Sequence, residues 1–314
     1  MKKKNKKLAK RIIEIVLSII LIVCAAYLAP TETPGSHDTT LPTSSGQIME
    51  TLPPIPNGEL KVYVFDVGQA DCILVESNNS YMMIDGGNNP DGKLVVNQLK
   101  EMGVTKIDYL VGTHPHEDHI GGLDNILKNF EVGVLYMPAH EYDSATYRDV
   151  IKAANSKNVE NVAPELGHVF NVGDAKCEIM AIDNEDEDPN INSIIIEVTH
   201  GKNKFLFTGD AEIENEERRL WNDIDVLKVA HHGSSTSSSE DFMEQVRPEI
   251  ALISVGTDNS YGHPHKEVME LLESYDMDIY RTDTQGTIIV TSDGSKCTVE
   301  TFESIDLEGN TSSR

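Results

Sequence analysis

Cysteine is scarce in this chain, and its placement supports neither a disulfide framework nor a cysteine-bound metal. There are four cysteines among 314 residues. Cys24 lies in an apolar run near the N-terminus, and Cys72, Cys177 and Cys297 each lie in a segment with the pattern of a strand. Because no Cys-x-x-Cys pair is present, a zinc site built from cysteines is not supported. We therefore interpret the cysteines as small buried hydrophobic residues.

Basic residues are also few, and they are unevenly placed. The sequence has 26 Lys and Arg against 52 Asp and Glu, a formal net charge of −26. Seven of the basic residues lie in the first eleven positions; without these and Glu14, 19 basic residues stand against 51 acidic ones, a net charge of −32. A surface this acidic repels nucleic acid over most of its area, which disfavours tight binding of long duplex DNA. Bound divalent cations can reverse the sign locally, so a short strand or a small ester stays open as a substrate.

Long apolar stretches are missing after residue 29, but residues 12–29 form one directly behind the lysine-rich residues 1–11. Eighteen residues in a helix span about 27 Å, just enough to cross the hydrocarbon core of a membrane. The lysines predict that the N-terminus stays in the cytoplasm and that the rest of the chain lies outside. We therefore expect a single-pass anchor in the cell membrane with an extracellular domain. A signal peptide, cleaved to give a secreted protein, is the alternative; Pro30 and Tyr27 disfavour cleavage after Ala29.

The remainder divides into a linker, one domain and a tail. Residues 30–58 are rich in Thr, Pro, Ser and Gly, which predicts a disordered stalk. Residues 59–304 form the predicted domain, and residues 305–314 a flexible tail. Strands come first and helices punctuate each half, so we expect an α/β fold with sheets between helical layers. Strands are predicted at 61–65, 72–76, 81–84, 109–112, 177–182, 194–198, 204–207, 226–230, 250–255, 279–282, 287–291 and 298–302, and helices at 94–102, after Gly122, and at 212–221, 240–246 and 266–274.

Residues 113–122 carry the strongest chemical signal, the sequence Thr-His-Pro-His-Glu-Asp-His-Ile-Gly-Gly directly after an apolar strand. His114 and His116 lie two positions apart in an extended turn, so both can face one ion. Asp118 and His119 can reach a second ion as the chain enters a helix. Such nitrogen and oxygen ligands suit Zn²⁺, with Mn²⁺ or Fe as alternatives. A polar loop rich in histidine by chance is the competing interpretation, and the spacing disfavours it.

The pattern His-x-His-x-Asp-His-x-Gly-Gly resembles the signature of the metallo-β-lactamase superfamily. Residues 65–71, 227–234 and 259–264 resemble blocks of its ComEC-like branch, which contains the hydrolase domain of a DNA-uptake protein. These blocks follow the order of the family and cover nearly the whole domain. The resemblance implies an αββα sandwich with two divalent metal ions at one rim.

The resemblance also implies roles for residues outside this motif. Asp85 would be a buried carboxylate that orients the ligand imidazoles, and Asp210 the carboxylate that bridges both ions. His231 and His232 follow a predicted strand. One of them would complete the second metal site and the other would contact substrate or support the ligands; the sequence alone does not say which.

One departure from the wider superfamily concerns the first metal. Most members have a further metal-binding histidine between the His119 and Asp210 positions, where this chain has Asn192. The first metal would then have His114, His116 and Asp210 from the protein, with water or a weak Asn192 contact.

Weaker candidates lie in two loops beside the expected site. Tyr261 and His263 precede a predicted helix, where substrate contacts gather in this fold; a structural turn is the alternative for Tyr261. Ser234 opens a Ser/Thr-rich stretch whose first residues could donate hydrogen bonds to an oxyanion. A flexible loop with a helix cap is the alternative.

Together these observations predict a hydrolase in which two metal ions activate a hydroxide. The predicted catalytic residues are Asp118, His231, His232 and His263, with a histidine protonating the leaving group or clamping a phosphate. The branch suggests a phosphodiester or phosphate ester outside the membrane, either DNA or a cell-wall phosphodiester. A hydrolase of a lactone, β-lactam or other carboxylic ester is one alternative, and a non-catalytic wall-polymer-binding module is another. The sequence predicts no oligomeric state.

Overall fold

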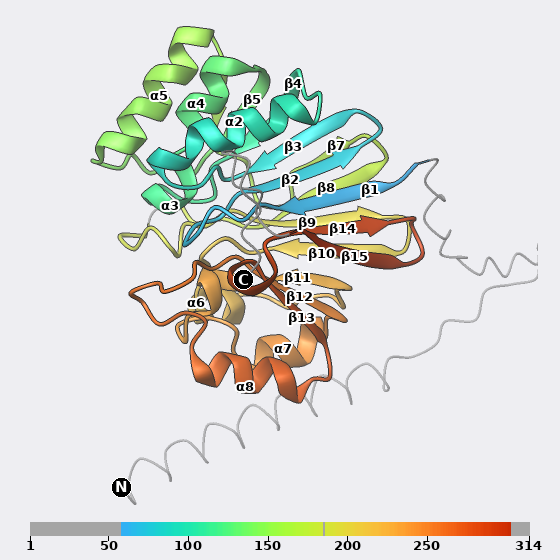
Figure 1. Ribbon diagram of the computed structural model, residues 1–314. Helices are drawn as coiled ribbons and strands as arrows, with labels where there is room; N and C mark the ends of the chain where they lie inside the picture. The colour runs from blue at the N-terminus through green and yellow to red at the C-terminus, as the bar shows by residue number, and fades with distance from the viewer. Residues whose placement is uncertain (1–57, 185, 303–314) are drawn as a thin grey trace, which may run out of the picture. The chain divides into compact units, whose positions relative to one another are not determined.

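The computed structural model describes residues 58–184 and 186–302. These residues form two stacked β-sheets with helices on both outer faces (Figure 1). The predicted basic segment, membrane anchor and tail (1–11, 12–29 and 305–314) lie outside the described residues, as does all of the linker but its last residue. Among the helices of the described residues, none is both long and apolar enough to cross a bilayer.

The first sheet has eight strands: β1 (Leu60–Val64), β2 (Ile73–Ser77), β3 (Ser80–Ile84), β4 (Lys106–Val111), β5 (Glu131–Tyr136), β6 (Glu160–Val162), β14 (Thr287–Ser292) and β15 (Cys297–Phe302). Their order is β15-β14-β1-β2-β3-β4-β5-β6. The strands from β15 to β3 pair antiparallel, and those from β3 to β6 pair parallel.

The second sheet has seven strands: β7 (Val169–Val172), β8 (Ala175–Ala181), β9 (Ile195–His200), β10 (Asn203–Phe207), β11 (Val226–Lys228), β12 (Ile250–Ile253) and β13 (Asp278–Arg281). They lie in the order β13-β12-β11-β10-β9-β8-β7. Here β7 to β10 are antiparallel, and β10 to β13 are parallel. Each sheet therefore has a parallel half, whose strands all end at one edge.

The helices divide between the two outer faces. Those of the first half are η1 (Asn89–Asp91), α2 (Gly92–Glu101), α3 (Glu117–Ile120), α4 (Leu123–Asn129) and α5 (Ala145–Lys157). Those of the second half are α6 (Ile213–Glu217), η2 (Ala230–Gly233), α7 (Glu240–Val246), α8 (Lys266–Ser274) and α9 (Thr282–Gln285). Figure 1 shows α2, α4 and α5 over the first sheet, and α7 and α8 over the second.

Three buried hydrophobic clusters hold these layers together, and β2 shows how one strand serves two of them. Ile73 and Val75 belong to the cluster between the sheets, whereas Leu74 belongs to the cluster under α2, α4 and α5. Successive side chains of a strand point to opposite faces. A strand that is covered on both sides therefore has an almost continuously apolar sequence. A third cluster, which includes Phe242 and Leu272, lies between the second sheet and α7 and α8. The expected αββα sandwich is confirmed.

Several element boundaries differ from the expectation, and two of them border the candidate ligands. The helix predicted at 212–221 is only α6, which ends at Glu217, and the indole of Trp221 donates to the carbonyl of Glu216 at 2.9 Å. This charged segment has no apolar stripe to bury, so packing does not extend the helix. The strand predicted at 226–230 ends at Lys228 and is followed by the turn η2.

Candidate metal centre

The candidate ligands lie at the carboxyl ends of the parallel strands of both sheets. Asp85 follows β3, the histidine motif follows β4, Asp210 follows β10, and His231 and His232 follow β11. Because β3 and β4 are parallel, as are β10 and β11, the segments after them emerge at the same edges. Residues that are over a hundred positions apart thereby meet at one rim of the sandwich.

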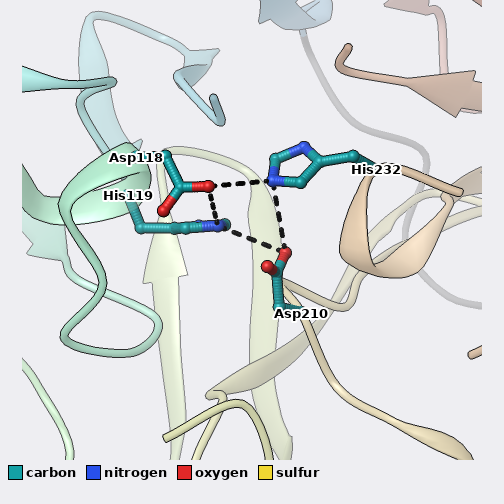
Figure 2. Close-up of side chains that lie close together, drawn as sticks. All are labelled: Asp118, His119, Asp210 and His232. Atoms are coloured by element: carbon teal, nitrogen blue, oxygen red, sulfur yellow. Dashed lines mark ion pairs between the residues drawn. The ribbon is translucent and has the colours of Figure 1, made fainter. Parts of the chain in front are cut away.

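Four side chains form a compact group, the larger of two groups of possible ligands in the described part of the chain: Asp118, His119, Asp210 and His232 (Figure 2). Nε2 of His119 lies 3.9 Å from Oδ2 of Asp118 and 3.2 Å from Oδ1 of Asp210. Nε2 of His232 lies 3.4 Å from the same oxygen of Asp118 and 3.7 Å from that of Asp210. Neighbouring ligands around a tetrahedral Zn²⁺ with bonds of about 2.0–2.2 Å are about 3.3–3.6 Å apart. The four distances, 3.2–3.9 Å, are close to that spacing, so the four side chains could hold one divalent ion.

The lack of hydrogen-bond partners for three atoms of this group also fits a bound metal ion. Nε2 of His119, Nε2 of His232 and Oδ1 of Asp210 are buried and have no hydrogen-bond partner among the described residues. An unpartnered buried polar atom destabilises a fold by about 1–3 kcal/mol, and three of them here point toward one another. A bound cation would satisfy all three at once, so the residues present fit a divalent metal.

Asp85 fixes the orientation of His119 from behind. Asp85 is fully buried, and its Oδ2 lies 2.8 Å from Nδ1 of His119. The amide and the hydroxyl of Thr113 also donate to Asp85, at 2.8 and 2.7 Å. A carboxylate on Nδ1 holds the proton on that nitrogen and leaves Nε2 free to bind a metal. The structure thus places Asp85 where the resemblance implied.

His232 is supported in the same way from a second side. Its Nδ1 donates to the carbonyl of Ser254 at 2.9 Å and lies 3.5 Å from Oδ1 of Asp71. Asp71 in turn pairs with Lys228, whose Nζ is 2.9 Å from Oδ2 of Asp71. Both charged residues are almost fully buried. A chain of interior contacts from β11 therefore reaches the metal centre through Asp71.

The two oxygens of Asp210 face different histidines. Oδ1 faces His119 and His232, whereas Oδ2 lies 3.9 Å from Nε2 of His114 and 3.6 Å from Nε2 of His231. Asp210 is 2 % exposed, and its amide donates to the hydroxyl oxygen of Ser193 at 3.3 Å. This division between two sets of imidazoles is compatible with the bridging role that the resemblance implies for Asp210.

The first metal group is less complete than the second. Nε2 of His114 lies 3.0 Å from Nδ1 of His116, but neither histidine belongs to the ligand groups whose atoms all lie within 4.8 Å of one another in the described part of the chain. The side chain of Asn192 is buried and donates to the carbonyls of Asp186 and Asp188. None of its hydrogen bonds goes to the two histidines, so its proposed metal contact stays a prediction.

The structure separates the positions of His231 and His232. His232 joins the compact group, whereas His231 is partly exposed and lines the pocket in front of it. Nδ1 of His231 lies 3.1 Å from the hydroxyl of Thr236 and 3.6 Å from Glu212, so its Nε2 is directed toward Asp210. Ser234 supports this loop rather than the pocket, because it is buried and its hydroxyl lies 3.2 Å from that of Thr236.

The local electrostatics favour positive charge at the compact group. Burial alone would lower the pKa of His119, but Asp210, Asp85 and Asp118 around it raise the pKa well above its ordinary value. The pKa of His232 is raised for the same reason, against the effect of burial. The pKa of Asp210 is held well below its ordinary value by His119 and His232, although burial opposes this. Protons in the metal-free protein thus occupy positions that a cation would take.

The pocket in front of these residues has a volume of about 320 Å³. His263 lies on its wall; burial, together with His232, His231 and His265, lowers the pKa of His263 to about 4, so its ring is neutral at pH 7. Gln69 also lines the pocket, and its amide nitrogen lies 3.5 Å from Nδ1 of His263. The rest of the lining is His116, Glu117, Asp118, Asp210, His231, His232 and Tyr261.

Backbone conformations at the rim are uncommon ones. Asp85, His231 and His232 have φ values of 58°, 51° and 54°, in the left-handed region that L-residues with side chains rarely adopt. Such conformations cost free energy and gather at functional sites. Gly121 and Gly122 allow the histidine motif to pack directly on the 86–89 loop, because a Cβ on either would lie within 2.3 Å of backbone atoms there.

Several residues of the site escaped the sequence prediction. Asp71 was present in a recognised block but had no assigned role, and Lys228 is unusual only as a lysine inside an apolar strand. Gln69, Glu212 and Thr236 reach the site from separate loops. No spacing within the sequence connects these residues, so only the folded chain shows their contribution.

Comparisons with known proteins identify relatives of this chain. The ComE operon protein 3 of Bacillus subtilis (strain 168) is 30% identical over 258 residues, which are 75% of this chain and 33% of the relative. Recombination protein 2 of Haemophilus influenzae is 32% identical over 237 residues, 73% of this chain and 28% of that protein. Competence protein ComA of Neisseria gonorrhoeae is 28% identical over 279 residues, 86% of this chain and 38% of that protein. The chain thus spans about a third of the length of these relatives.

The fold has a counterpart among solved structures. The metallo-beta-lactamase fold protein YhfI of Bacillus subtilis aligns with a TM-score of 0.52 and 13% identity, covering 75% of this chain and all of that one. The family profile described as "Metallo-beta-lactamase superfamily" matches residues 65–257. The chain therefore belongs to the metallo-beta-lactamase superfamily, and its competence and recombination relatives are consistent with the ComEC-like branch.

Proposed function

We propose that this chain is a metal-dependent hydrolase of phosphodiesters or phosphate esters that acts outside the membrane. The observation that carries the proposal is the compact group of Asp118, His119, Asp210 and His232. Its three unpartnered buried atoms are preorganised for a cation, and the pocket opens directly in front of them. Membership of the superfamily supports hydrolysis in general.

The residues of the pocket define how such a reaction would proceed. Two divalent ions bound here would supply a nucleophilic water at neutral pH and would stabilise negative charge on the bond under attack. Asp210 presents one oxygen to each histidine set. His231, held by Thr236 and Glu212, directs Nε2 into the pocket, where it can donate to a phosphoryl oxygen or to the leaving group. The neutral ring of His263, whose centroid lies 5.7 Å from that of His231, can supply a second donor in the pocket.

The character of the pocket favours a phosphate ester over a carboxylic ester. Its walls are polar and rich in imidazole, which suits several phosphoryl oxygens better than a single carbonyl oxygen. The relatives are named as competence and recombination proteins, which supports a nucleic-acid phosphodiester. A cell-wall phosphodiester has the same reacting group and stays a candidate.

A substrate panel tests this proposal. Purified protein reconstituted with Zn²⁺ or Mn²⁺ should hydrolyse bis-p-nitrophenyl phosphate and should leave a chromogenic lactone and a chromogenic β-lactam largely intact. Preference for either of the latter would point to a carboxylic-ester hydrolase. No turnover with any of them, despite bound metal, would support a non-catalytic wall-polymer-binding module.

The extracellular location rests on the lysine-rich residues 1–11 and the apolar run 12–29. Protease added to intact cells stripped of their wall should release the domain by cutting within residues 30–58. A domain that stays protected would contradict this topology. A released N-terminus that begins near residue 30 without protease would instead indicate a cleaved signal peptide.

A further inference from the structure

Tyr261 is an exposed aromatic side chain at the mouth of the metal pocket. It is 67% exposed, and it is one of five large hydrophobic side chains with substantial exposure among the described residues. It belongs to none of the three hydrophobic clusters that stabilise the fold, yet it lines the pocket together with the predicted ligands. Stability therefore does not account for an aromatic ring at this position.

The loop that carries Tyr261 is held firmly. The side chain of Asn259 donates to the carbonyls of Gly256 and His263 and accepts from the amide of His263, at 3.0, 2.7 and 2.9 Å. The ring of His265 lies 3.3 Å from the carbonyl of Tyr261. Since an aromatic side chain has few rotatable bonds, a ring on a fixed loop loses little entropy when a ligand covers it.

One face of the ring is already occupied. Tyr261 stacks on His263 with ring centroids 5.6 Å apart and an interplanar angle of 23°. His263 is packed in turn against His231 and His232. This stack fixes the plane of the tyrosine relative to the metal centre and leaves its outer face to solvent. The outer face is therefore a flat apolar surface beside the point of hydrolysis.

The pocket lacks the usual means of holding a phosphate chain. None of the described residues that line it is a lysine or an arginine, whereas Glu117, Asp118 and Asp210 are acidic. Apart from the metals, binding of a phosphodiester must therefore depend on uncharged contacts. Stacking of a nucleobase on an aromatic side chain contributes about 1–3 kcal/mol, with little dependence on sequence.

We propose that the outer face of Tyr261 is a stacking platform for the nucleobase adjacent to the scissile phosphate. The substrate class is then a nucleoside phosphodiester or a single-stranded nucleic acid, whose bases are free to stack. Duplex DNA fits poorly, because its bases are stacked internally and the protein surface is acidic. This inference rests on the proposed function and names the substrate class of that same site.

The test compares two esters that share a leaving group. Water converts p-nitrophenyl thymidine 5′-phosphate to thymidine 5′-phosphate and p-nitrophenol, and methyl p-nitrophenyl phosphate to methyl phosphate and p-nitrophenol. Full-length, metal-reconstituted protein should prefer the nucleoside ester. Tyr261→Ala should reduce the ratio of the two kcat/KM values by roughly 5- to 150-fold, mainly through the KM of the nucleoside ester. Tyr261→Phe should retain the ratio, as should Phe302→Ala, which removes an exposed aromatic ring from β15.

Two outcomes would overturn the stacking platform. One is an unchanged ratio in Tyr261→Ala. The other is an equal loss of kcat/KM for p-nitrophenyl phosphorylcholine in Tyr261→Ala. This ester carries no base, so that result would indicate a wall-type substrate.

A binding measurement separates this inference from the proposed function. A short single strand containing 2-aminopurine should lose fluorescence on binding to the metal-loaded protein and to Tyr261→Phe, but not on mixing with Tyr261→Ala. Quenching without hydrolysis of any ester would refute the hydrolase and support the platform. Hydrolysis of both esters without Tyr261-dependent quenching would refute the platform and support the hydrolase.

Discussion

The ion pair between Asp71 and Lys228 connects the stability of the interior to the metal centre. The two side chains are 2 % and 0 % exposed, and their charged atoms are 2.9 Å apart. The ammonium group of Lys228 makes one further hydrogen bond, to the carbonyl of Val229 at 3.0 Å. Asp71 also faces His232. Removal of the carboxylate therefore leaves a buried ammonium group without its counter-ion and a predicted ligand without part of its support.

Asp71→Ala should lower the free energy of unfolding of the metal-free protein by about 3–5 kcal/mol, the cost of leaving one member of a buried pair uncompensated. The backbone hydrogen bonds of Asp71, to Asp118 and from Gly87, do not depend on its side chain. A matched control is Glu270→Ala, which breaks the exposed i,i+4 pair with Lys266. That change should cost less than about 1 kcal/mol.

A double variant isolates the charge from the packing. Asp71→Leu combined with Lys228→Met replaces both ions by apolar side chains, and such replacements are often neutral or stabilising by about 1–4 kcal/mol. The double variant should therefore recover most of the stability that Asp71→Ala loses. Its affinity for metal should stay below that of the wild type, because His232 retains only the carbonyl of Ser254 on its Nδ1.

Urea denaturation is the assay, and the chain contains its own probe. The single tryptophan, Trp221, is buried and packs edge-on against Phe242 with ring centroids 5.3 Å apart, so its fluorescence should report unfolding. An Asp71→Ala variant no less stable than Glu270→Ala would refute the account of the pair. A double variant as unstable as Asp71→Ala would show that lost packing, not unpaired charge, is responsible.

Four further outcomes are expected. Asp210→Ala should leave the fold intact and remove at least one ion. Its turnover should fall by more than the 10²–10³ that loss of one hydrogen-bonding group costs. Near-normal metal content by elemental analysis, together with a near-normal rate, would contradict the assignment of Asp210 as a metal ligand. Asp85→Asn should weaken metal binding by about 10- to 100-fold, because the carboxylate orients His119, and a dialysis titration would detect it. Since the pKa values of His119 and His232 are raised, metal must displace their protons; the affinity for metal should therefore rise with pH throughout the range below these raised pKa values and level off above them, and calorimetry showing no proton release below them would oppose this. Metal titration of the wild type should show one tight and one weaker site, whereas two equal sites would contradict the difference between the two ligand groups.

The strands that border the motifs were predicted well, because each is a short apolar run that ends in a glycine or a histidine motif. The segment between Phe130 and Val172 carried no prediction, although it contains β5, α5, β6 and β7. In β5, Gly133 weakens the strand pattern, but it is required, since a Cβ there would lie 2.4 Å from the carbonyl oxygen of Asp108. Close approach of a neighbouring strand cannot be inferred from the sequence of β5 itself.

The helix α5 was missed for a different reason. Its buried face includes Thr146, Ala153 and Ala154, with Val150 as the larger apolar residue. Small residues pack closely on α4 and the first sheet but contribute little to a hydrophobic period. The hydroxyl of Ser144 caps the helix by accepting from the amide of Tyr147 at 3.0 Å. A serine at this position is a capping signal from which the start of the helix can be predicted.

The ligand positions could be assigned from the sequence because the motif after β4 is dense and local, whereas the pairing of ligands could not. Which of His231 and His232 belongs to the compact group depends on two successive left-handed residues in η2. Without glycine at either position, the sequence gives no sign of that turn. The turn directs His232 inward to Asp118 and Asp210, and it leaves His231 facing the pocket.

The contrast between the two ligand groups follows from which hydrogen bonds are already made. In the compact group, the second nitrogens of His119 and His232 are held by Asp85 and by the Ser254 carbonyl, so both Nε2 atoms are fixed before a metal arrives. In the first group, the amide nitrogen of Asn192 is committed to the 186–188 backbone, and that position supplies no imidazole. An ion at the first group would therefore complete its coordination with water, with substrate or with Oδ1 of Asn192, which is buried and has no hydrogen-bond partner among the described residues. An ion held there, beside His231 and the open pocket, would be the more exchangeable of the two and, for the proposed phosphate-ester substrate, the better placed to meet a phosphoryl oxygen.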